Sequence, residues 1–307
     1  MGFNMAKNLR AKIPAEDTLT IYDLNADTTS RFVKEVGIAA SSAGVSGKGT
    51  AIEVAESPRE VAEKSETIIT VLPESSHVKS AFWSILEHEL PTEGLSEDRL
   101  FIDCSTIDPA SSREVANAVH SASRGKFVDA PMSGGVVGAK AGTLTFMLGA
   151  PECLIDRVNP VLSLMGSRIL HLGPQGAGLS GKLANNYLLA LTNIATAEAM
   201  NLGIKLGLEP KALGAMINVC TGRSWSSEVN NPVPGVLEGS PASRGYEGGF
   251  GVSLMKKDLN LAIAAAAEAD VRLELAEVAR LVYEAVEKDE QCKGKDFSVV
   301  YRYLGGA

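Results

Sequence analysis

The sequence is poor in cysteine and has no excess of positive charge, and each deficit argues against a class of protein. Its four cysteines lie far apart with no C-x-x-C pair, which fits free thiols in a reducing compartment better than disulfides or a zinc site. The four histidines form neither an H-x₃-H nor an H-E-x-x-H pattern, so we expect no metal ion. The formal net charge of −8 argues against nucleic acid or an anionic membrane as the main partner. No apolar run reaches the roughly 18 residues that a transmembrane helix needs.

The beginning of the chain also lacks the first half of a dinucleotide-binding fingerprint. Residues 1–9 fit the last glycine of that fingerprint, Gly2, followed by the helix that it opens. This glycine lets the helix pack closely on a strand, so that the N–H groups of its first turn face a pyrophosphate. Neither the apolar strand nor the G-x-G turn that should precede it is present. We therefore interpret the chain as N-terminally truncated, and no targeting segment is visible in it.

Strand-like and helix-like segments alternate up to residue 172, which predicts an α/β, Rossmann-type domain with a mostly parallel sheet over residues 1–172. Helical patterns occur near 25–36, 58–64 and 109–123. Small and polar residues at 40–52 predict a surface insertion. The strands expected are 18–22, 67–72, 100–103, 126–129, 144–148 and 169–172.

After residue 173 the β signal disappears, which predicts an all-α domain over residues 173–307. It begins with a long interdomain helix at about 178–206, which should end at Gly207 as a C-terminal cap. Pro210 suits the first turn of the next helix. A loop-rich stretch follows at 221–252, and the last helices are expected at about 253–269 and 272–288.

Candidate cofactor residues follow three of the expected strands. Asp23 stands 21 positions after Gly2, where an acidic residue hydrogen-bonds the ribose hydroxyl of NAD and repels the 2′-phosphate of NADP. Asp23 could instead cap the next helix, with Asn25 and Asp27 as rival caps. The carboxyl ends of parallel strands form the ligand crevice. Two further strand ends therefore offer either cofactor contacts or ordinary loop residues at Leu72, Pro73 and Thr106.

A glycine-rich stretch at 129–145 is a candidate substrate loop. Four of its glycines fall within nine residues after a strand, which lets the backbone pass close to a ligand. Their N–H groups and the Ser133 hydroxyl could receive a carboxylate. A flexible turn between strands is the alternative interpretation.

The stretch 173–186 leads glycines into a helix that carries Lys182 and Asn186. Residues four apart share one face of a helix, so both side chains could reach one small ligand. The helix is otherwise apolar, and partial desolvation should lower the pKa of Lys182 toward the range of a general base. A lysine that extends to solvent beside a capping asparagine is the alternative. In the first turns of the helix expected from about 253, either Lys257 or Asp258 could face the crevice, or the adjacent lysines could form a solvated face.

At these residues the sequence resembles the β-hydroxyacid dehydrogenase family. The family's cofactor pattern G-x-G-x-M-G-x-x-M-A-x-N-L matches residues 1–9 in its second half. The substrate pattern D-A-P-x-S-G-G-x-x-G-A-x-x-G-T-L-T matches residues 129–145, and G-x-x-G-x-G-x-x-x-K-x-x-N matches residues 173–185. A K-D-L-x-L-A pattern matches residues 257–262, and the resemblance extends over the chain except for residues 40–52.

The resemblance implies a role for each of these positions. It makes Lys182 the catalytic lysine. It places the substrate on Ser133, Gly134, Gly135 and Asn186. His77 stands where relatives have an asparagine that contacts the cofactor. The resemblance implies cofactor contacts at Leu72, Pro73, Thr106 and Lys257, and His77 adds its position to this set. Together with Gly2 and Asp23 from the fingerprint spacing, these are the expected cofactor residues.

The same resemblance implies NAD-dependent oxidation of 3-hydroxyisobutyrate to methylmalonate semialdehyde in valine breakdown, with NADP as the less favoured cofactor. A related NADPH-dependent semialdehyde or glyoxylate reductase is one alternative. A truncated, non-catalytic chain that only oligomerises is another. The resemblance further implies a homodimer or homotetramer in the mitochondrial matrix, with the cytoplasm as the alternative location.

Overall fold

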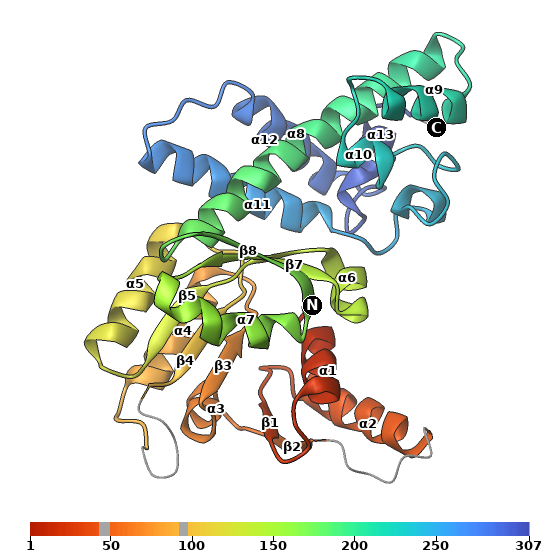
Figure 1. Ribbon diagram of the computed structural model, residues 1–307. Helices are drawn as coiled ribbons and strands as arrows, with labels where there is room; N and C mark the ends of the chain where they lie inside the picture. Colours follow the sequence, from red (N-terminus) through yellow and green to blue (C-terminus); the bar gives the residue numbers. More distant parts are fainter. Residues whose placement is uncertain (43–49, 92–97, 307) are drawn as a thin grey trace. The chain divides into compact units, whose positions relative to one another are not determined.

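A computed structural model describes residues 1–42, 50–91 and 98–306, which form two units, Met1–Lys182 and Leu183–Ala307 (Figure 1). The first unit contains a largely parallel sheet with helices, and the second is helical. The predicted class, a Rossmann-type domain followed by an all-α domain, is therefore confirmed. The boundary at residue 173 stays a prediction.

The main sheet of the first unit is built on three adjacent parallel strands in the order β3-β4-β5. β7 continues the sheet antiparallel to β5, pairs antiparallel with β6, and pairs in parallel with β8. β1 and β2 form a separate parallel pair. The strands are β1 (Thr18–Ile21), β2 (Ala51–Val54), β3 (Thr67–Thr70), β4 (Leu100–Asp103), β5 (Lys126–Asp129), β6 (Met132–Ser133), β7 (Leu144–Gly149) and β8 (Gly166–Gly173).

Helices cover both faces of this sheet because its central strands are apolar on both sides. On β4, Leu100 and Ile102 pack into one apolar cluster together with residues of α1 and α7, and Phe101 packs into another with residues of α4 and α5. This follows the two-residue alternation of a strand. The helices of this unit are α1 (Gly2–Lys12), α2 (Ala26–Ser42), α3 (Pro58–Lys64), α4 (Ser75–Leu86), α5 (Pro109–Ser121), α6 (Gly135–Ala141), the 3-10 turn η1 (Glu152–Leu154) and α7 (Ile155–Ser163).

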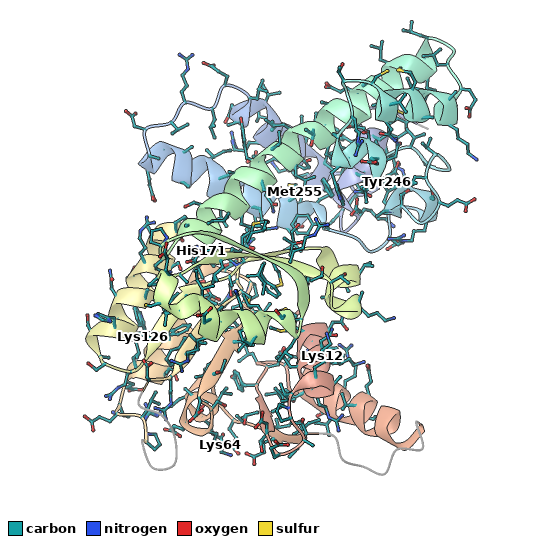
Figure 2. All side chains as sticks on the ribbon, in the orientation of Figure 1. Lys12, Lys64, Lys126, His171, Tyr246 and Met255 are labelled. Carbon is teal, nitrogen blue, oxygen red and sulfur yellow. The ribbon has the colours of Figure 1, made fainter. Side chains whose placement is uncertain are left out.

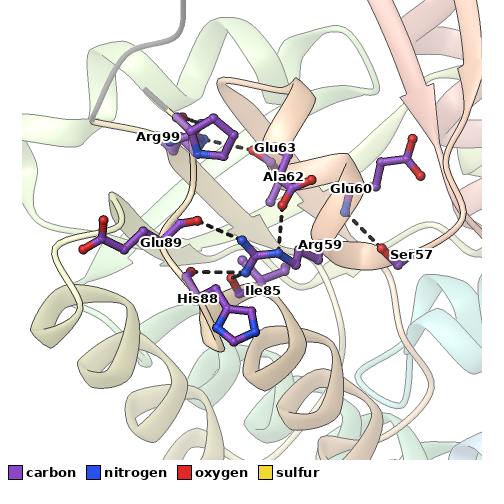
Figure 3. Close-up of polar contacts among 10 residues, drawn as sticks. Ser57, Arg59, Glu60, Ala62, Glu63, Ile85, His88, Glu89 and Arg99 are labelled. Atoms are coloured by element: carbon purple, nitrogen blue, oxygen red, sulfur yellow. Dashed lines mark hydrogen bonds and ion pairs between the residues drawn. The ribbon is translucent and has the colours of Figure 1, made fainter. Parts of the chain in front are cut away.

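Arg59 holds the end of α4 against α3, and Arg99 binds α3 from directly before the strand β4 (Figure 3). The guanidinium of Arg59 donates to the carbonyl oxygens of Ile85 at 3.2 Å, His88 at 3.1 Å and Glu89 at 2.8 Å. The last carbonyls of a helix have no partner within it, so this guanidinium takes the place of a C-terminal cap. Arg99, only 2% exposed, donates from Nε to the carbonyl of Ala62 at 2.9 Å.

The second unit packs its helices around a core that includes Met255 and Tyr246, both labelled in Figure 2. Asn193 on α8 donates to the Tyr283 hydroxyl and to the carbonyl of Phe297, each at 3.0 Å. No helix among the described residues is both long and apolar enough to cross a membrane. The elements are α8 (Ala177–Lys205, which begins in the first unit), α9 (Pro210–Val219), α10 (Trp225–Glu228), η2 (Pro241–Arg244), α11 (Val252–Glu268), α12 (Ala276–Lys288), η3 (Phe297–Val299) and α13 (Val300–Tyr303).

The long helix α8 ends where its sequence predicts. Gly207 has a φ of +91°, and its N–H donates to the carbonyl of Ile204, while that of Leu208 donates to Gly203. This is the Schellman arrangement that a glycine after the helix allows. Pro210 begins α9, which Glu209 caps through its carboxylate.

One expectation from the sequence is wrong, and one alternative interpretation is excluded. Residues 40–52 are not simply an insertion, because residues 40–42 finish α2 and residues 51–52 begin β2; residues 43–49 lie outside the described part. The sequence analysis did not predict β2, because this strand is short and most of its side chains are exposed. The glycine-rich stretch is not a flexible turn either, since Gly135–Ala141 form α6.

Candidate functional site

The carboxyl ends of β3 and β4 are joined by a small hydrogen-bonded cluster. Asp103 Oδ1 accepts from the hydroxyls of Thr70 at 2.7 Å and Ser105 at 2.6 Å. The Leu72 N–H donates to the Ser105 hydroxyl at 2.8 Å, which fixes the backbone just after β3. Burial raises the pKa of Asp103, while these hydrogen bonds oppose the rise. The cluster therefore holds in place three of the predicted cofactor positions, Leu72, Pro73 and Thr106.

His77 lies in the first turn of α4, four residues after Pro73, and its side chain is exposed. Its N–H donates to the carbonyl of Glu74 at 3.1 Å, so the backbone takes part in the helix while the imidazole lies outside the core. The imidazole of His77 is therefore an exposed group in the helix that follows the end of β3.

Gly2 begins α1 next to the end of β3. A Cβ built on Gly2 would lie 3.4 Å from Cβ of Val71, the residue that precedes Leu72. The helix has no acidic residue in its first turn, and its N-cap Met1 makes no side-chain hydrogen bond. An α-helix leaves the N–H groups of its first turn without partners inside the helix, so this end suits an anionic group.

Asp23 follows β1 on an exposed loop and does not cap α2. Its Oδ1 accepts from the N–H of Asn25 at 2.9 Å. Asn25, directly before α2, accepts from the N–H of Asp27 at 3.0 Å and is therefore the cap. Of the two roles considered for Asp23, helix capping belongs to Asn25 instead.

Ser133, Gly134 and Gly135 lie together at the start of α6. Ser133 ends β6, Gly134 is the N-cap of α6 with a φ of +128°, and Gly135 has a φ of +61°. These positive φ values favour glycine, because L side chains rarely adopt them. A Cβ on Gly134 would lie 3.2 Å from Leu144, whereas nothing lies within 4 Å of one on Gly135. The first residues of α6 thus follow directly after Ser133, and a side chain at Gly135 would meet open space.

Polar side chains tie α1 to α6 and to the end of α7. Asn8 donates from Nδ2 to the carbonyl of Ala139 at 2.8 Å. Lys12, labelled in Figure 2, donates to the carbonyl of Leu164 at 2.6 Å. The helix that begins at Gly2 and the helix that begins at Gly135 are therefore held in one arrangement.

Lys182 lies in the second turn of α8 and is only 7% exposed. The start of this helix is fixed to the end of β5, because Asp129 accepts the N–H groups of Gly176 and Leu179. Leu183, the next residue, is also buried. The lysine therefore lies among buried side chains one turn beyond a fixed helix start.

The second unit has a polar cluster of its own around Asp258. Asn186, 1% exposed and four residues after Lys182 on α8, donates from Nδ2 to Asp258 Oδ2 at 2.6 Å. Lys257 pairs with Asp258 Oδ1 at 3.0 Å. The cluster joins two residues that the sequence analysis named separately, Asn186 and Lys257.

Comparisons with known proteins agree along the whole chain. A family model described as the NAD binding domain of 6-phosphogluconate dehydrogenase matches residues 1–173. A second, described as NAD-binding of NADP-dependent 3-hydroxyisobutyrate dehydrogenase, matches residues 176–304. The mitochondrial 3-hydroxyisobutyrate dehydrogenase of Rattus norvegicus is 43% identical over 99% of this chain and 84% of its own length. The chain belongs to the 3-hydroxyisobutyrate dehydrogenase family.

Two further members of this family support the assignment. The probable mitochondrial 3-hydroxyisobutyrate dehydrogenase of Dictyostelium discoideum is 41% identical over 99% of this chain and 88% of that protein. The structure of Mycobacterium tuberculosis 3-hydroxyisobutyrate dehydrogenase with L-serine has a TM-score of 0.85 and 34% identity, and covers 99% of this chain and 95% of that one. The chain is therefore an oxidoreductase that acts on a CH–OH group with a nicotinamide cofactor.

The residues present fit such a cofactor. The start of α1 offers N–H groups to phosphate beside Val71, and β1 ends near an exposed carboxylate at Asp23. In this member of the 3-hydroxyisobutyrate dehydrogenase family, Gly2 lies next to the end of β3. Asp258 also joins Asn186 to Lys257.

Sequence reasoning missed the supporting residues Asp103, Ser105 and Asp129. A signal for two of them is present, because Asp103 and Asp129 are each the last residue of a short strand that is otherwise rich in apolar side chains. A polar group in that place points toward the ligand edge of a parallel sheet.

Proposed function

We propose that this chain oxidises 3-hydroxyisobutyrate to methylmalonate semialdehyde with NAD, as a step of valine breakdown, and that Lys182 is the general base. The observation that carries the proposal is the burial of Lys182 just beyond the fixed start of α8. Taking a lysine out of water favours its uncharged form, which is the form that can accept a proton.

In the proposed reaction Lys182 Nζ takes the proton of the substrate hydroxyl as the carbon–oxygen bond becomes a carbonyl. When bound, the nicotinamide accepts the hydride that leaves the same carbon. The proton and the hydride together account for the two hydrogens that the alcohol loses. Lys182 must therefore lie within hydrogen-bonding reach of the hydroxyl oxygen.

The substrate carboxylate is assigned to the start of α6. Ser133, Gly134 and Gly135 are consecutive there, and a helix N-terminus favours an anion. Asn186 is assigned to the substrate as well. Its Nδ2 carries two hydrogens, one of which binds Asp258, so the second can serve a substrate oxygen.

The cofactor is assigned to Gly2, Asp23, Leu72, Pro73, His77, Thr106 and Lys257, with NAD preferred to NADP. The exposed carboxylate of Asp23 supports this preference, because it would repel a 2′-phosphate. Asp23→Asn should raise kcat/KM with NADP relative to NAD. Asp27→Asn, which removes a similarly exposed carboxylate in the first turn of α2, should leave that ratio unchanged. An unchanged ratio in Asp23→Asn would contradict the assignment.

The decisive experiment combines a substrate panel with Lys182→Ala. The unsubstituted chain should give its highest kcat/KM with 3-hydroxyisobutyrate among small hydroxyacids. Lys182→Ala should lower kcat by about 10²–10⁴-fold, the range typical of a lost general base, while the Kd for NAD changes little. Lys205→Ala, an exposed lysine at the end of the same helix, is the control. Near-normal turnover of Lys182→Ala would refute the role.

We further propose a mitochondrial matrix location and a homodimer or homotetramer. The location is supported by the relatives from Rattus norvegicus and Dictyostelium discoideum, whose names state that they are mitochondrial. Exposed apolar residues on α12 of the second unit, Val278 and Leu281, suit a contact between copies. Light scattering of the purified protein measures the oligomer, and a monomer at micromolar concentration would contradict it.

A further inference from the structure

We propose that Asp129 is a positioning residue whose carboxylate clamps the first turn of α8 and thereby sets the place of Lys182. The inference rests on the proposed role of Lys182 as the base. It concerns a side chain that does not itself react, and it is carried by the contacts of that side chain within the first unit.

Both oxygens of the Asp129 carboxylate bind the start of α8. Oδ1 accepts the N–H of Gly176 at 2.6 Å, and Oδ2 accepts the N–H of Leu179 at 2.8 Å. Asp129 is fully buried at the end of β5, so its place is fixed by the sheet. Lys182 follows Leu179 by three residues, which is one turn along the same helix. A shift of this first turn therefore moves the lysine.

Two glycines leave the carboxylate little room for another position. A Cβ on Gly149 would lie 2.3 Å from Asp129 Oδ1, and one on Gly178 would lie 2.9 Å from Oδ2. Gly149 is also the antiparallel partner of Asp129 in the sheet. The helix start, β5 and β7 thus meet around one side chain, and a side chain at Gly149 would push the carboxylate away.

The clamp needs an ionised carboxylate, because each oxygen accepts one N–H. Burial raises the pKa of Asp129 to about 6, with nearby Asp103 contributing to the rise and the two N–H groups opposing it. Protonation would turn one acceptor into a donor and release one contact. The ionisable groups on the surrounding elements are Asp103 on β4, Cys104 directly after it, His171 on β8, Arg113 on α5 and Lys182 on α8.

The reverse reaction separates Asp129 from Lys182 in a pH profile. Reduction of the semialdehyde with NADH needs Lys182 in its protonated form, which low pH preserves. A fall in kcat as pH drops through about 6 therefore reports another group, and we assign it to Asp129. Asp129→Asn should lower kcat at pH 7 by about 10- to 100-fold, leave KM for NADH nearly unchanged and remove the fall at acid pH.

Glu209→Gln is the matched control, because Glu209 also binds two N–H groups through its two oxygens, at the start of α9. It should keep the acid fall and the kcat of the unsubstituted chain. An acid fall that persists unchanged in Asp129→Asn, or a kcat at pH 7 within twofold, would overturn the proposal.

A second measurement does not depend on the variant folding or on turnover. The amide NMR signals of Gly176 and Leu179 in the unsubstituted chain should titrate with a midpoint near that of the acid fall in kcat. Amide signals that stay constant from pH 5 to 7.5 would overturn the clamp. If the unsubstituted chain does not reduce the semialdehyde at all, the proposed function fails, and the amide titration then decides the clamp alone.

Discussion

The two units bury polar side chains in different ways. The first unit buries carboxylates at strand ends, where Asp103 receives hydroxyls and Asp129 receives helix N–H groups. The second unit buries asparagine amides that donate across elements: Asn186 to Asp258, Asn193 to Tyr283 and Asn230 to Asp296. In a parallel sheet the ends of neighbouring strands lie at one edge, so their polar groups come together through the topology. In the helical unit the three hydrogen bonds instead join residues that are 72, 90 and 66 positions apart in the sequence.

Two asparagines on α8 test this comparison most strongly. Asn186→Ala should lower kcat/KM for the hydroxyacid by about 10²–10³-fold, because the proposed donor to the substrate is lost. Asn193→Ala should lower the free energy of unfolding by about 1–3 kcal/mol, because the Tyr283 hydroxyl and the Phe297 carbonyl lose their donor, and leave activity per folded molecule unchanged. Steady-state kinetics with urea unfolding measures both, and equal activity losses would erase the distinction.

The buried carboxylate of Asp129 should make stability depend on pH. Its pKa is about 6 in the folded chain against an ordinary value of 3.8 for a solvated aspartate, so the unfolded chain binds fewer protons between these values. Protonation of Asp129 therefore contributes up to about 3 kcal/mol to the free energy of unfolding below pH 3.8. This contribution is lost as the pH rises through 6.

Urea unfolding of the chain and of Asp129→Asn between pH 4 and 7 checks this, since the difference between the two should fall as pH rises. For Glu209→Gln, the difference in the free energy of unfolding from the unsubstituted chain should change with pH in the opposite direction. Hydrogen bonds from Lys211 and Ala212 hold the pKa of Glu209 below its usual value, so its contribution is lost as pH falls. A pH-independent difference for Asp129→Asn would contradict the expectation.

Tyr283→Phe sharpens the description of the second unit. The Tyr283 hydroxyl donates to the carbonyl of Ala190 at 3.1 Å and accepts from Asn193, and the side chain is fully buried. Its loss should cost about 1–2 kcal/mol of the free energy of unfolding, because a buried carbonyl loses its donor. The midpoint of urea unfolding measures this, with kcat as the control, and a lower kcat at unchanged stability would place Tyr283 in the catalytic machinery instead.

The smallest effect is expected at the surface of the first unit. Lys64, labelled in Figure 2, pairs with Glu60 at 2.9 Å and Glu53 at 3.2 Å. Exposed ion pairs are screened by water and salt, so Lys64→Ala should not shift the unfolding midpoint measurably. A clear shift that disappears at high salt would show that these pairs form a stabilising network.

The sequence predicts features that depend on neighbouring residues. The end of α8 at Gly207 and the start of α9 at Pro210 follow from backbone geometry within a few positions. The strand ends near Leu72 and Thr106 follow from short apolar runs.

Features that depend on distant partners could not be predicted in this way. The link from Asn186 to Asp258 requires knowing how two helices pack, and the caps that Arg59 supplies to α4 come from another helix. The role of Asp129 was missed because its partners, the N–H groups at Gly176 and Leu179, belong to the backbone and leave no mark in the residue types.

The continuity of α8 limits how the length of the chain can change. Its 29 residues run without a break through both Lys182 and Asn186. Each residue turns an α-helix by about 100°, so a single inserted alanine between these positions would rotate Asn186 off the face that carries Lys182. Substitutions on the exposed side of this helix should be tolerated, whereas insertions and deletions there should abolish turnover even in a folded protein.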